Sequence, residues 1–299
     1  MVEAIIEDLE AKQQLFQQVE DVVSAEAILC TNTSSLSVAA ISSVLKHPSR
    51  FGGLHFFNPA PLMPLVEIIP SVQTRVGWAE ELETLMSSWG KVPVIAKDTP
   101  GFIVNRVARP FYSEAIKLFE EGVASVPEID AALKGAGFRM GPFELTDLIG
   151  HDVNFTVTET VWGQFFFDPR FRLSITQKRL KEAGLLGRKS GKGFYSYGEQ
   201  GGPAEAQAAV ELNDDLAAKI VERIVCMLAN EGLDAVWLGV ASPENVDLAM
   251  TKGVNYPKGP LAWGEEIGWA RVLEVLETCH SHYGDDRYRP CPLLRHLVS

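Results

Sequence analysis

The sequence contains a long internal repeat, and this repeat limits what the chain can fold into more than any other feature. The segment Gly122-Val-Ala-Ser125 recurs as Gly239-Val-Ala-Ser242, 117 residues further along. Flanking residues align as well, with one residue of slippage: Arg106 with Arg223, Glu114 with Glu231, Asp130 with Asp247, Gly141-Pro142 with Gly259-Pro260, and Ile149-Gly150 with Ile267-Gly268. This spacing is far longer than the period of a solenoid repeat. It predicts two copies of one domain.

The region before the first copy has a different pattern. Short apolar runs alternate there with stretches of helical periodicity. The expected strands are residues 2–6, 27–31, 51–57, 65–69 and 92–96, and the expected helices are residues 7–24, 36–45 and 78–89. Strands separated by helices indicate a parallel α/β sheet.

The alternation ends at Thr99-Pro100-Gly101, and helical periodicity dominates the rest of the chain. The expected helices of the first copy are residues 102–121, 126–134, 142–150 and 152–166, and the glycine-rich, basic segment 187–197 closes that copy. Residues 198–206 have the composition of a linker, and helices resume near Gln207. The predicted fold is an α/β domain (1–98) followed by two related all-α domains (99–197 and 207–299).

Charge and composition argue against several classes of protein. A net charge of −12 opposes binding to the phosphate backbone of nucleic acids. No apolar run approaches the roughly 18 residues of a transmembrane helix, so no membrane partner is expected. The acidic start lacks the basic region of a secretory signal. The four cysteines and the pair His280 and His282 match no disulfide or zinc pattern, so we expect a cytoplasmic protein without a metal site.

A histidine and a glutamate in neighbouring apolar strands form the sharpest candidate for a catalytic pair. His55 lies near the end of one expected strand, and Glu67 follows twelve residues later in the next. A charge inside so apolar a strand is costly unless it is paired. A His–Glu pair also makes an acid–base catalyst, because the carboxylate orients the imidazole. The spacing leaves a purely structural His–Glu contact open as the alternative.

Other polar residues follow the expected strands. Ser34 and Ser35 come after the strand 27–31, at the carboxyl end where open α/β sheets bind ligands. Ser35 also precedes an apolar helix, so we expect it to cap that helix and Ser34 to face the ligand. Asn58 suits a turn as well as a ligand contact. Asn105 lies in an expected helix, where it can hold a substrate oxygen or serve as a capping or core polar residue.

Several segments, in this order and at these spacings, resemble the L-3-hydroxyacyl-CoA dehydrogenase family. They are NTSS (32–35), GLHFFNPAP (53–61), LVEII (65–69), DTPGFIVNR (98–106), GRKSGKGFYSY (187–197), VNYPKGPLAWGEEIGW (254–269) and RYRPCPLLR (287–295). The resemblance covers nearly the whole chain and implies an incomplete Rossmann-type domain before the helical copies. The two-copy form is similar to the 3-hydroxybutyryl-CoA and 3-hydroxyadipyl-CoA dehydrogenases of phenylacetate catabolism.

The resemblance implies a role for each matching residue. His55 would take the proton from the 3-hydroxyl of an L-3-hydroxyacyl-CoA as hydride leaves C3, and Glu67 would orient it. Ser34 and Asn105 would hydrogen-bond the substrate oxygen. The cofactor would be NAD, and the positions that match its contacts are Ala4, Glu7, Lys12, Asn32, Ser34 and Asn58. The expected product is a 3-ketoacyl-CoA, as in fatty-acid or phenylacetate-type catabolism.

Departures from the family pattern define the alternative function. The Gly-x-Gly-x-x-Gly loop that places a pyrophosphate at a helix N-terminus is absent, and two-copy relatives have a longer segment between the copies. The alternative is a truncated chain, inactive or completed by a partner, that acts only through its helical association domains. A misassigned start of a longer protein is a further reading. Glu222 stands where the first copy has Asn105, so the second copy is expected to serve packing or to mimic a second subunit. The helical domains are also a candidate surface for forming a homo-oligomer.

Overall fold

The computed structural model describes residues 1–198 and 212–299 of the chain. These residues form two compact units: unit 1 comprises Met1–Arg106 and Ala235–Val254, and unit 2 comprises Val107–Asp234 and Asn255–Ser299. Most of the expected linker 198–206, and the expected restart of helices near Gln207, lie outside the described residues. Within the described ranges, no helix is both long enough and apolar enough to cross a membrane.

Unit 1 is built on a five-stranded sheet with the strand order β1-β2-β3-β4-β5. The strands are β1 (Val2–Glu3), β2 (Leu29–Thr31), β3 (Phe51–Phe56), β4 (Leu65–Pro70) and β5 (Val92–Ile95). Its helices are α1 (Leu9–Val22), α2 (Val38–Ser42), α3 (Trp78–Ser88), α4 (Val104–Val107) and α11 (Pro243–Gly253). All five expected strands and the three expected helices between them are present.

The sheet is mixed, so the prediction of a parallel sheet was wrong at one position. β3 and β4 pair antiparallel, whereas the other three neighbouring pairs are parallel. Only residues 57–64 connect β3 with β4. A parallel return needs a crossover of about a dozen residues or more, so this short connection permits only an antiparallel pair.

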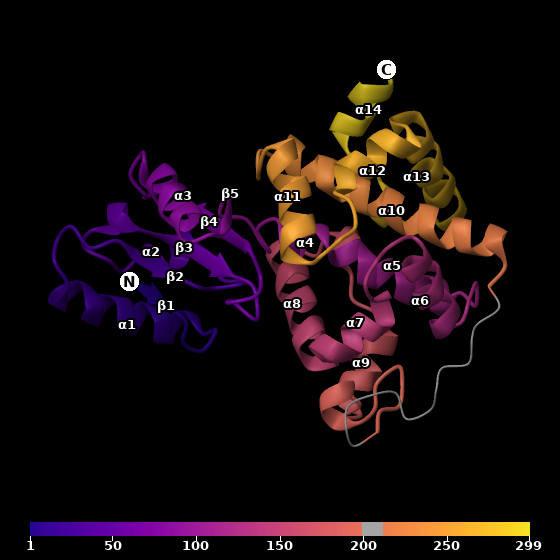
Figure 1. Ribbon diagram of the computed structural model, residues 1–299, viewed down its shortest axis with the longest axis horizontal. Coiled ribbons are helices and arrows are strands. Elements are labelled where there is room, and N and C mark those ends of the chain that lie inside the picture. Colours follow the sequence, from indigo (N-terminus) through magenta and orange to yellow (C-terminus); the bar gives the residue numbers. More distant parts are fainter. Residues whose placement is uncertain (199–211) are drawn as a thin grey trace. The chain divides into compact units, whose positions relative to one another are not determined.

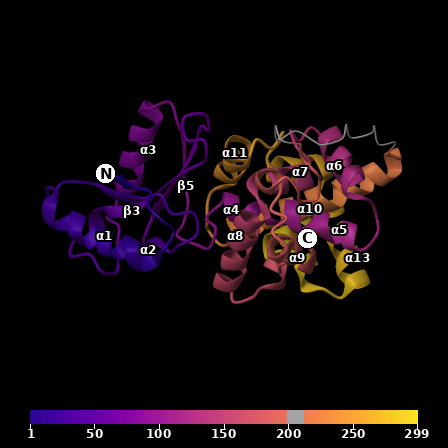
Figure 2. The same ribbon diagram turned by 90° about the horizontal axis from the view of Figure 1, so that it is seen from below.

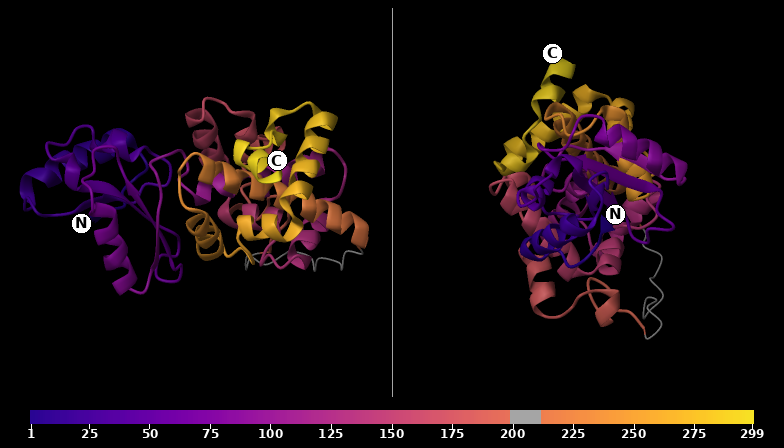
Figure 3. Two further views of the ribbon diagram at one scale, coloured as in Figure 1. Left: turned by 90° about the horizontal axis from the view of Figure 1, so that it is seen from above. Right: turned by 90° about the vertical axis from the view of Figure 1, so that its left-hand side faces the viewer.

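Helices cover both faces of the sheet (Figures 1 and 3). Trp78 and Leu82 of α3 pack with Leu54 and Val66 in one apolar cluster. On the opposite face, Phe16 of α1 stacks edge-on against Phe51 with ring centroids 4.7 Å apart. Both layers follow from the two-residue period of the strands, which sends alternate side chains to opposite faces.

Helix α1 is capped by a neighbouring side chain, whereas α2 is capped both by a neighbouring side chain and by one that is distant in the sequence. Asp8 caps α1, and its carboxylate accepts the N–H of Ala11. The cap of α2 is Ser37, and the expectation that Ser35 caps this helix was wrong. The carboxylate of Asp98 also accepts the N–H groups of Val38 and Ala39 at 3.1 and 2.8 Å. A side chain some sixty residues away thus satisfies the free donors of this helix end.

Unit 2 is all-helical. Its helices are α5 (Arg109–Glu120), α6 (Val126–Gly135), α7 (Pro142–Ile149), α8 (His151–Gln164), α9 (Ile175–Glu182), the greater part of α10 (Asp214–Trp237), α12 (Pro260–Ile267), α13 (Trp269–Tyr283) and α14 (Pro292–Val298). The single helix expected over 102–121 is instead divided into α4 and α5. Pro110 in the first turn of α5 explains the division, because proline lacks an N–H and its ring clashes with the preceding helical turn.

The elements confirm the repeat. Helices α6, α7, α8 and α9 have counterparts of the same order in α11, α12, α13 and α14, and the short 3₁₀ turns Pro169–Phe171 and Asp286–Tyr288 also correspond. Gly122 and Gly239, which align in the sequence, have φ angles of 70° and 64°. Glycine takes this left-handed conformation without steric cost. The two copies therefore share local backbone geometry as well as sequence.

Helix α10 begins the second copy and contacts the first copy within unit 2 (Figures 1 and 2). Its Arg223 donates to Glu114 of α5 at 2.5 Å and to Glu121 at 3.0 Å. It also donates to the hydroxyls of Tyr283 and Tyr288 at 2.9 and 2.8 Å. One largely covered guanidinium, in a side chain that is 12% exposed, thus joins a helix of the first copy to aromatic side chains of the second.

Candidate active site

His55 and Glu67 form a direct hydrogen bond across strands β3 and β4. The two residues are opposite one another in the antiparallel register, so their side chains project from the same face of the sheet. Nδ1 of His55 lies 2.7 Å from Oε2 of Glu67. The side chains are almost fully buried, with residue exposures of 6% for His55 and 0% for Glu67. The predicted pairing of these two residues is present in the structure.

Backbone donors hold the other oxygen of Glu67. The N–H groups of Ile103 and Val104 each donate to Oε1 at 3.0 Å. The chain reaches this position through Gly101 and Phe102, whose φ angles are 73° and 46°. A left-handed conformation is strained for phenylalanine, and such strain persists only where the surroundings impose it. The turn therefore presents two consecutive N–H groups to one carboxylate.

This clamp determines how the imidazole is oriented. With Oε1 accepting two N–H groups, Glu67 acts purely as an acceptor, so Nδ1 of His55 donates to Oε2. The neutral ring then has a lone pair on Nε2, which can accept a proton. The ring of His55 also lies against Phe57 and Phe102, with centroid distances of 4.6 and 5.9 Å. The arrangement suits a general base whose orientation is fixed by packing and by its carboxylate.

Ser34 and Asn105 lie close together at the end of the sheet where strand β2 finishes. Nδ2 of Asn105, on α4, donates to the backbone carbonyl of Ser34 at 3.3 Å. Both residues are half-buried. Two residues separated by 71 positions in the sequence thus meet at the loop that follows β2.

Glu7 gathers the donors of the loop after β2. Its Oε1 accepts the hydroxyl of Thr33 at 2.6 Å and the N–H groups of Ser34 and Ser35 at 2.8 and 3.0 Å. Partial burial acts to raise the pKa of Glu7, but these hydrogen bonds and the charge of Lys12 outweigh it and hold the pKa below its ordinary value. Glu7 is therefore a carboxylate at neutral pH.

Lys12 contacts acidic side chains rather than solvent. Its Nζ lies 2.7 Å from Oε1 of Glu3 and 3.5 Å from Oε2 of Glu7, and the residue is 0% exposed. Glu3 also accepts the hydroxyl of Thr31 at 2.7 Å. A buried charge must be paired in this way, and the pair keeps Glu7 in place at the edge of the sheet.

The remaining expected residues lie around this centre. Oδ1 of Asn32 accepts the N–H of Phe56 at 2.8 Å, so Asn32 anchors the end of β3 next to His55. Ala4 follows β1 and Asn58 follows β3, and both are exposed. All of the expected site residues belong to unit 1.

Sequence reasoning missed three polar residues that organise the site, of which Glu3 and Thr33 are buried and Asp98 is half-buried. Glu3 holds Lys12, Thr33 donates to Glu7, and Asp98 caps α2. A charge within the apolar run of residues 2–6 was a readable signal for Glu3, by the same argument that selected Glu67. Thr33 and Asp98 lie in polar stretches, where nothing in the sequence distinguishes them.

Comparison with known protein families yields two matches. Residues 1–99 match the model described as 3-hydroxyacyl-CoA dehydrogenase, NAD binding domain. Residues 101–197 and 220–299 match the model described as 3-hydroxyacyl-CoA dehydrogenase, C-terminal domain. The C-terminal model thus falls on both helical copies.

Individual relatives agree with the family models. The 3-hydroxyadipyl-CoA dehydrogenase of Escherichia coli is 42% identical, over 99% of this chain and 79% of its own length. The pig mitochondrial hydroxyacyl-coenzyme A dehydrogenase is 41% identical, over 66% of this chain and 63% of its own. The crystal structure of the 3-hydroxybutyryl-CoA dehydrogenase from Escherichia coli superposes with a TM-score of 0.89 at 40% identity, over 99% of this chain and 80% of that one.

Proposed function

The chain belongs to the 3-hydroxyacyl-CoA dehydrogenase family, and from this premise we propose that His55 is the acid–base catalyst with which it interconverts an L-3-hydroxyacyl-CoA and the 3-ketoacyl-CoA. The observation that supports this assignment is the His55–Glu67 hydrogen bond of 2.7 Å, with Glu67 clamped by two backbone N–H groups. A positioned general base of this kind contributes about 10²–10⁴-fold to a proton transfer.

His55 and its neighbours each have a task in the proposed reaction. In the oxidation, Nε2 of His55 accepts the proton of the 3-hydroxyl, and the carboxylate of Glu67 stabilises the imidazolium that forms. Ser34 and Asn105 hydrogen-bond the reacting oxygen and place it against the ring of His55. In the reduction, the imidazolium returns the proton to the same oxygen.

NAD is the cofactor of the family model, and the residues at this sheet edge fit its nicotinamide half. When bound, NAD accepts the hydride from C3. Glu7 has one oxygen occupied by Thr33, Ser34 and Ser35, while its side chain is 35% exposed and can accept ribose hydroxyls. Asn58 is exposed beside β3, where its amide can contact the nicotinamide. Because Lys12 is buried, its part is to position Glu7.

Activity of the purified 299-residue chain tests the proposal directly. Consumption of NADH with acetoacetyl-CoA is expected for the wild type, and His55→Gln is expected to lower kcat by about 10²–10⁴-fold. The glutamine amide can still donate to Glu67, so the circular dichroism spectrum and thermal midpoint should change little. His47→Gln, at an exposed histidine of the same unit, is the matched control. Equal losses of activity and stability in His55→Gln contradict the catalytic role.

The likeness to the two enzymes of Escherichia coli supports a narrower substrate. We propose that the acyl group is short, as in 3-hydroxybutyryl-CoA or 3-hydroxyadipyl-CoA, and that the chain acts in phenylacetate-type catabolism. Values of kcat/KM for these two substrates, compared with the value for a long-chain 3-hydroxyacyl-CoA, test this preference for a short acyl group. A preference for long-chain 3-hydroxyacyl-CoA contradicts it.

Three further assignments complete the proposal. The chain is divided into three domains, 1–98, 99–197 and 207–299, with a linker at 198–206. The four cysteines are unpaired thiols, which supports a reducing, cytoplasmic location, and cell fractionation tests it. Self-association through the helical copies is tested by light scattering on the purified chain.

A further inference from the structure

The repeat places one arginine at the same position in each helical copy, Arg170 and Arg287, and the two copies surround it with different side chains. Arg170, in the first copy, lies 2.6 Å from Asp234 and 3.4 Å from Glu231, and its Nη2 lies 3.2 Å from Asp168. These contacts place three carboxylates around one guanidinium. Despite its burial, the acidic neighbours raise the pKa of Arg170 above its ordinary value.

Arg287 occupies the aligned position in the second copy but has weaker partners. Asp285 and Glu114 correspond to Asp168 and Glu231 at the spacing of the repeat, and they lie 3.5 and 3.7 Å from the guanidinium of Arg287. Lys117 stands where the repeat places Asp234. The carboxylate that binds Arg170 most closely is thus replaced by a second cation. Among the described residues, Nε of Arg287 makes no hydrogen bond, although the residue is only 7% exposed.

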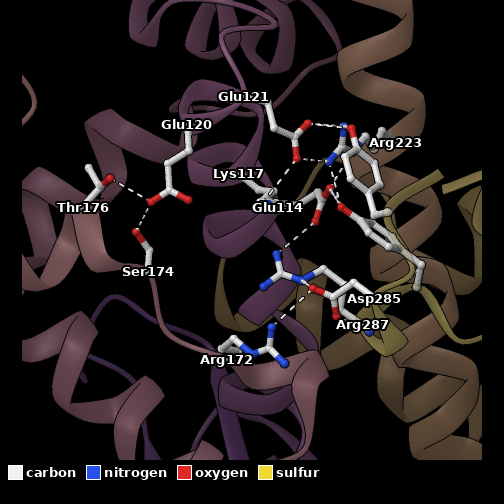
Figure 4. Close-up of polar contacts among 12 residues, drawn as sticks. Glu114, Lys117, Glu120, Glu121, Arg172, Ser174, Thr176, Arg223, Asp285 and Arg287 are labelled. Atoms are coloured by element: carbon white, nitrogen blue, oxygen red, sulfur yellow. Dashed lines mark hydrogen bonds and ion pairs between the residues drawn. The ribbon is translucent and has the colours of Figure 1, made fainter. Parts of the chain in front are cut away.

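A cavity of about 580 Å³ opens at this place in unit 2. Three of its lining residues are cationic, namely Lys117, Arg172 and Arg287. Figure 4 shows the guanidinium groups of Arg172 and Arg287 on one side and Ser174 and Thr176 on the other, with open space between them. The volume lies in the range of small-molecule sites, which is about 300–1,000 Å³.

The carboxylates around the cavity are already engaged. Glu120 accepts the hydroxyls of Ser174 and Thr176, both at 2.7 Å. Asp285 lies 3.5 Å from both Arg172 and Arg287. Behind the lining, Glu121 lies 3.7 Å from Lys117, and Glu114 lies 3.7 Å from Arg287. Each cation of the lining thus has an acidic partner, but among the described residues these ion pairs are all 3.5 Å or longer.

We propose that this cavity binds a phosphoryl group, free or carried by a small phosphorylated molecule. Arginine and lysine donate charge-assisted hydrogen bonds to phosphate oxygens, and the three cations of this lining are held only by ion pairs of 3.5 Å or longer. The anion takes the place that the carboxylate of Asp234 has beside Arg170. All of the lining residues belong to unit 2, whereas the catalytic pair belongs to unit 1, so the proposal is independent of the proposed reaction.

Calorimetric titration of the purified chain with inorganic phosphate, and separately with glycerol 3-phosphate, tests the site. Saturable binding with a Kd at or below about 1 mM is expected for at least one probe, as a few charge-assisted hydrogen bonds provide. Tighter binding of glycerol 3-phosphate identifies an ester as the ligand, and equal binding identifies the free ion. Absence of saturable heat for both probes up to about 10 mM overturns the proposal.

Substitutions locate the binding. Lys117→Asp restores the residue type found at position 234, so it should weaken binding at least about tenfold while the thermal midpoint without phosphate is unchanged or higher. Lys178→Asp, at an exposed lysine of α9 outside the cavity, should bind as the wild type does. Arg172→Gln removes an exposed cation of the cavity and provides a second variant, expected to weaken binding about threefold or more. Unchanged binding in both cavity variants contradicts the site.

Discussion

At the scale of single residues, the candidate site depends on one carboxylate with two kinds of partner. Glu67 accepts two backbone N–H groups on one oxygen and the imidazole of His55 on the other. A glutamate that only packed against its neighbours would need neither the strained turn at Phe102 nor a histidine opposite it. In the proposed reaction Glu67 therefore orients the imidazole, and His55 transfers the proton.

Glu67→Gln should lower kcat by about 10²–10⁴-fold and leave KM for NADH nearly unchanged. The amide oxygen would accept from Ile103 and Val104, so the amide nitrogen would face Nδ1 of His55. The imidazole must then accept at Nδ1 and carry its proton on Nε2, where it cannot act as a base. Steady-state kinetics checks this, with the exposed Glu81→Gln as control. An unchanged kcat would argue against the orienting role.

At the scale of elements, buried aspartates hold helix ends of the first helical copy. Asp130 accepts the N–H groups of Phe143 and Glu144 at the start of α7, at 2.9 and 3.0 Å, and the hydroxyl of Tyr195 at 2.8 Å. Asp147 accepts the N–H groups of Phe194 and Tyr195 at 3.0 and 2.9 Å. These contacts fasten the glycine-rich segment 187–197 to α6 and α7. The segment therefore has a structural part in this copy, since it closes over α6 and α7.

Asp130 should make the stability of the fold depend on pH. Burial raises the pKa of Asp130 to about 7, against the opposing hydrogen bonds of Phe143 and Tyr195. In the unfolded chain the carboxyl titrates near pH 4. Between about pH 4 and pH 7 the folded state holds a proton that the unfolded state has lost, so this contribution to stability is present below pH 4 and is lost as the pH rises through 7.

Asp130→Asn removes that dependence. The unfolding free energy of the wild type relative to the variant should therefore fall by about 2–3 kcal/mol between pH 5 and pH 8, on top of a constant offset. Urea unfolding across this range measures it. Asp215→Asn, at an exposed residue of α10, should run parallel to the wild type. Parallel profiles for Asp130→Asn would contradict the prediction.

At the scale of the whole molecule, the duplication is joined by ion pairs between the copies. Arg172 lies 3.5 Å from Asp285, and in the aligned pair Arg289 lies 3.0 Å from Asp168. Each copy thus offers an arginine to the aspartate of the other, as two subunits related by a two-fold axis do. Arg223 adds a further link between α5 and the tyrosines of the second copy.

Arg223→Met should destabilise unit 2 by about 3–5 kcal/mol. The methionine keeps the apolar stem, but Glu114, which is 0% exposed, loses its closest cation. Arg271→Met is the matched control, because Arg271 pairs with Glu222 at the surface, and it should cost at most about 1 kcal/mol. The shift of the urea midpoint measures both. Equal shifts in the two variants would contradict the prediction that the Arg223–Glu114 pair stabilises unit 2 more than a surface ion pair does.

Strand periodicity was sufficient to predict the contact between His55 and Glu67 but not the direction of their strands. A period of two residues marks β3 and β4 equally well in either direction, and helices elsewhere in the domain favoured a parallel sheet. The eight-residue connection between the two strands was the feature that indicated an antiparallel pair, because it is too short for a parallel crossover. Ser35 was expected to cap α2 because capping residues are recognised by type and position, yet Ser37 two residues later has the same chemistry.

The sequence by itself determined the duplication, the change from α/β to all-α at residues 99–101, and the residue types of the site. These features are local patterns or repeats, and local patterns reflect backbone preferences and burial. Only the tertiary structure decided what surrounds each charge. Glu67 meets N–H groups 36 and 37 residues away, and Arg287 meets Glu114 from the other end of unit 2. Ion pairs form between side chains that are close in space, whatever their separation in the sequence. Asp234 lies beside Arg170, and Lys117 lines the same cavity as Arg287, yet the members of each pair are more than sixty residues apart in the chain. A short stretch of sequence therefore cannot show these neighbours.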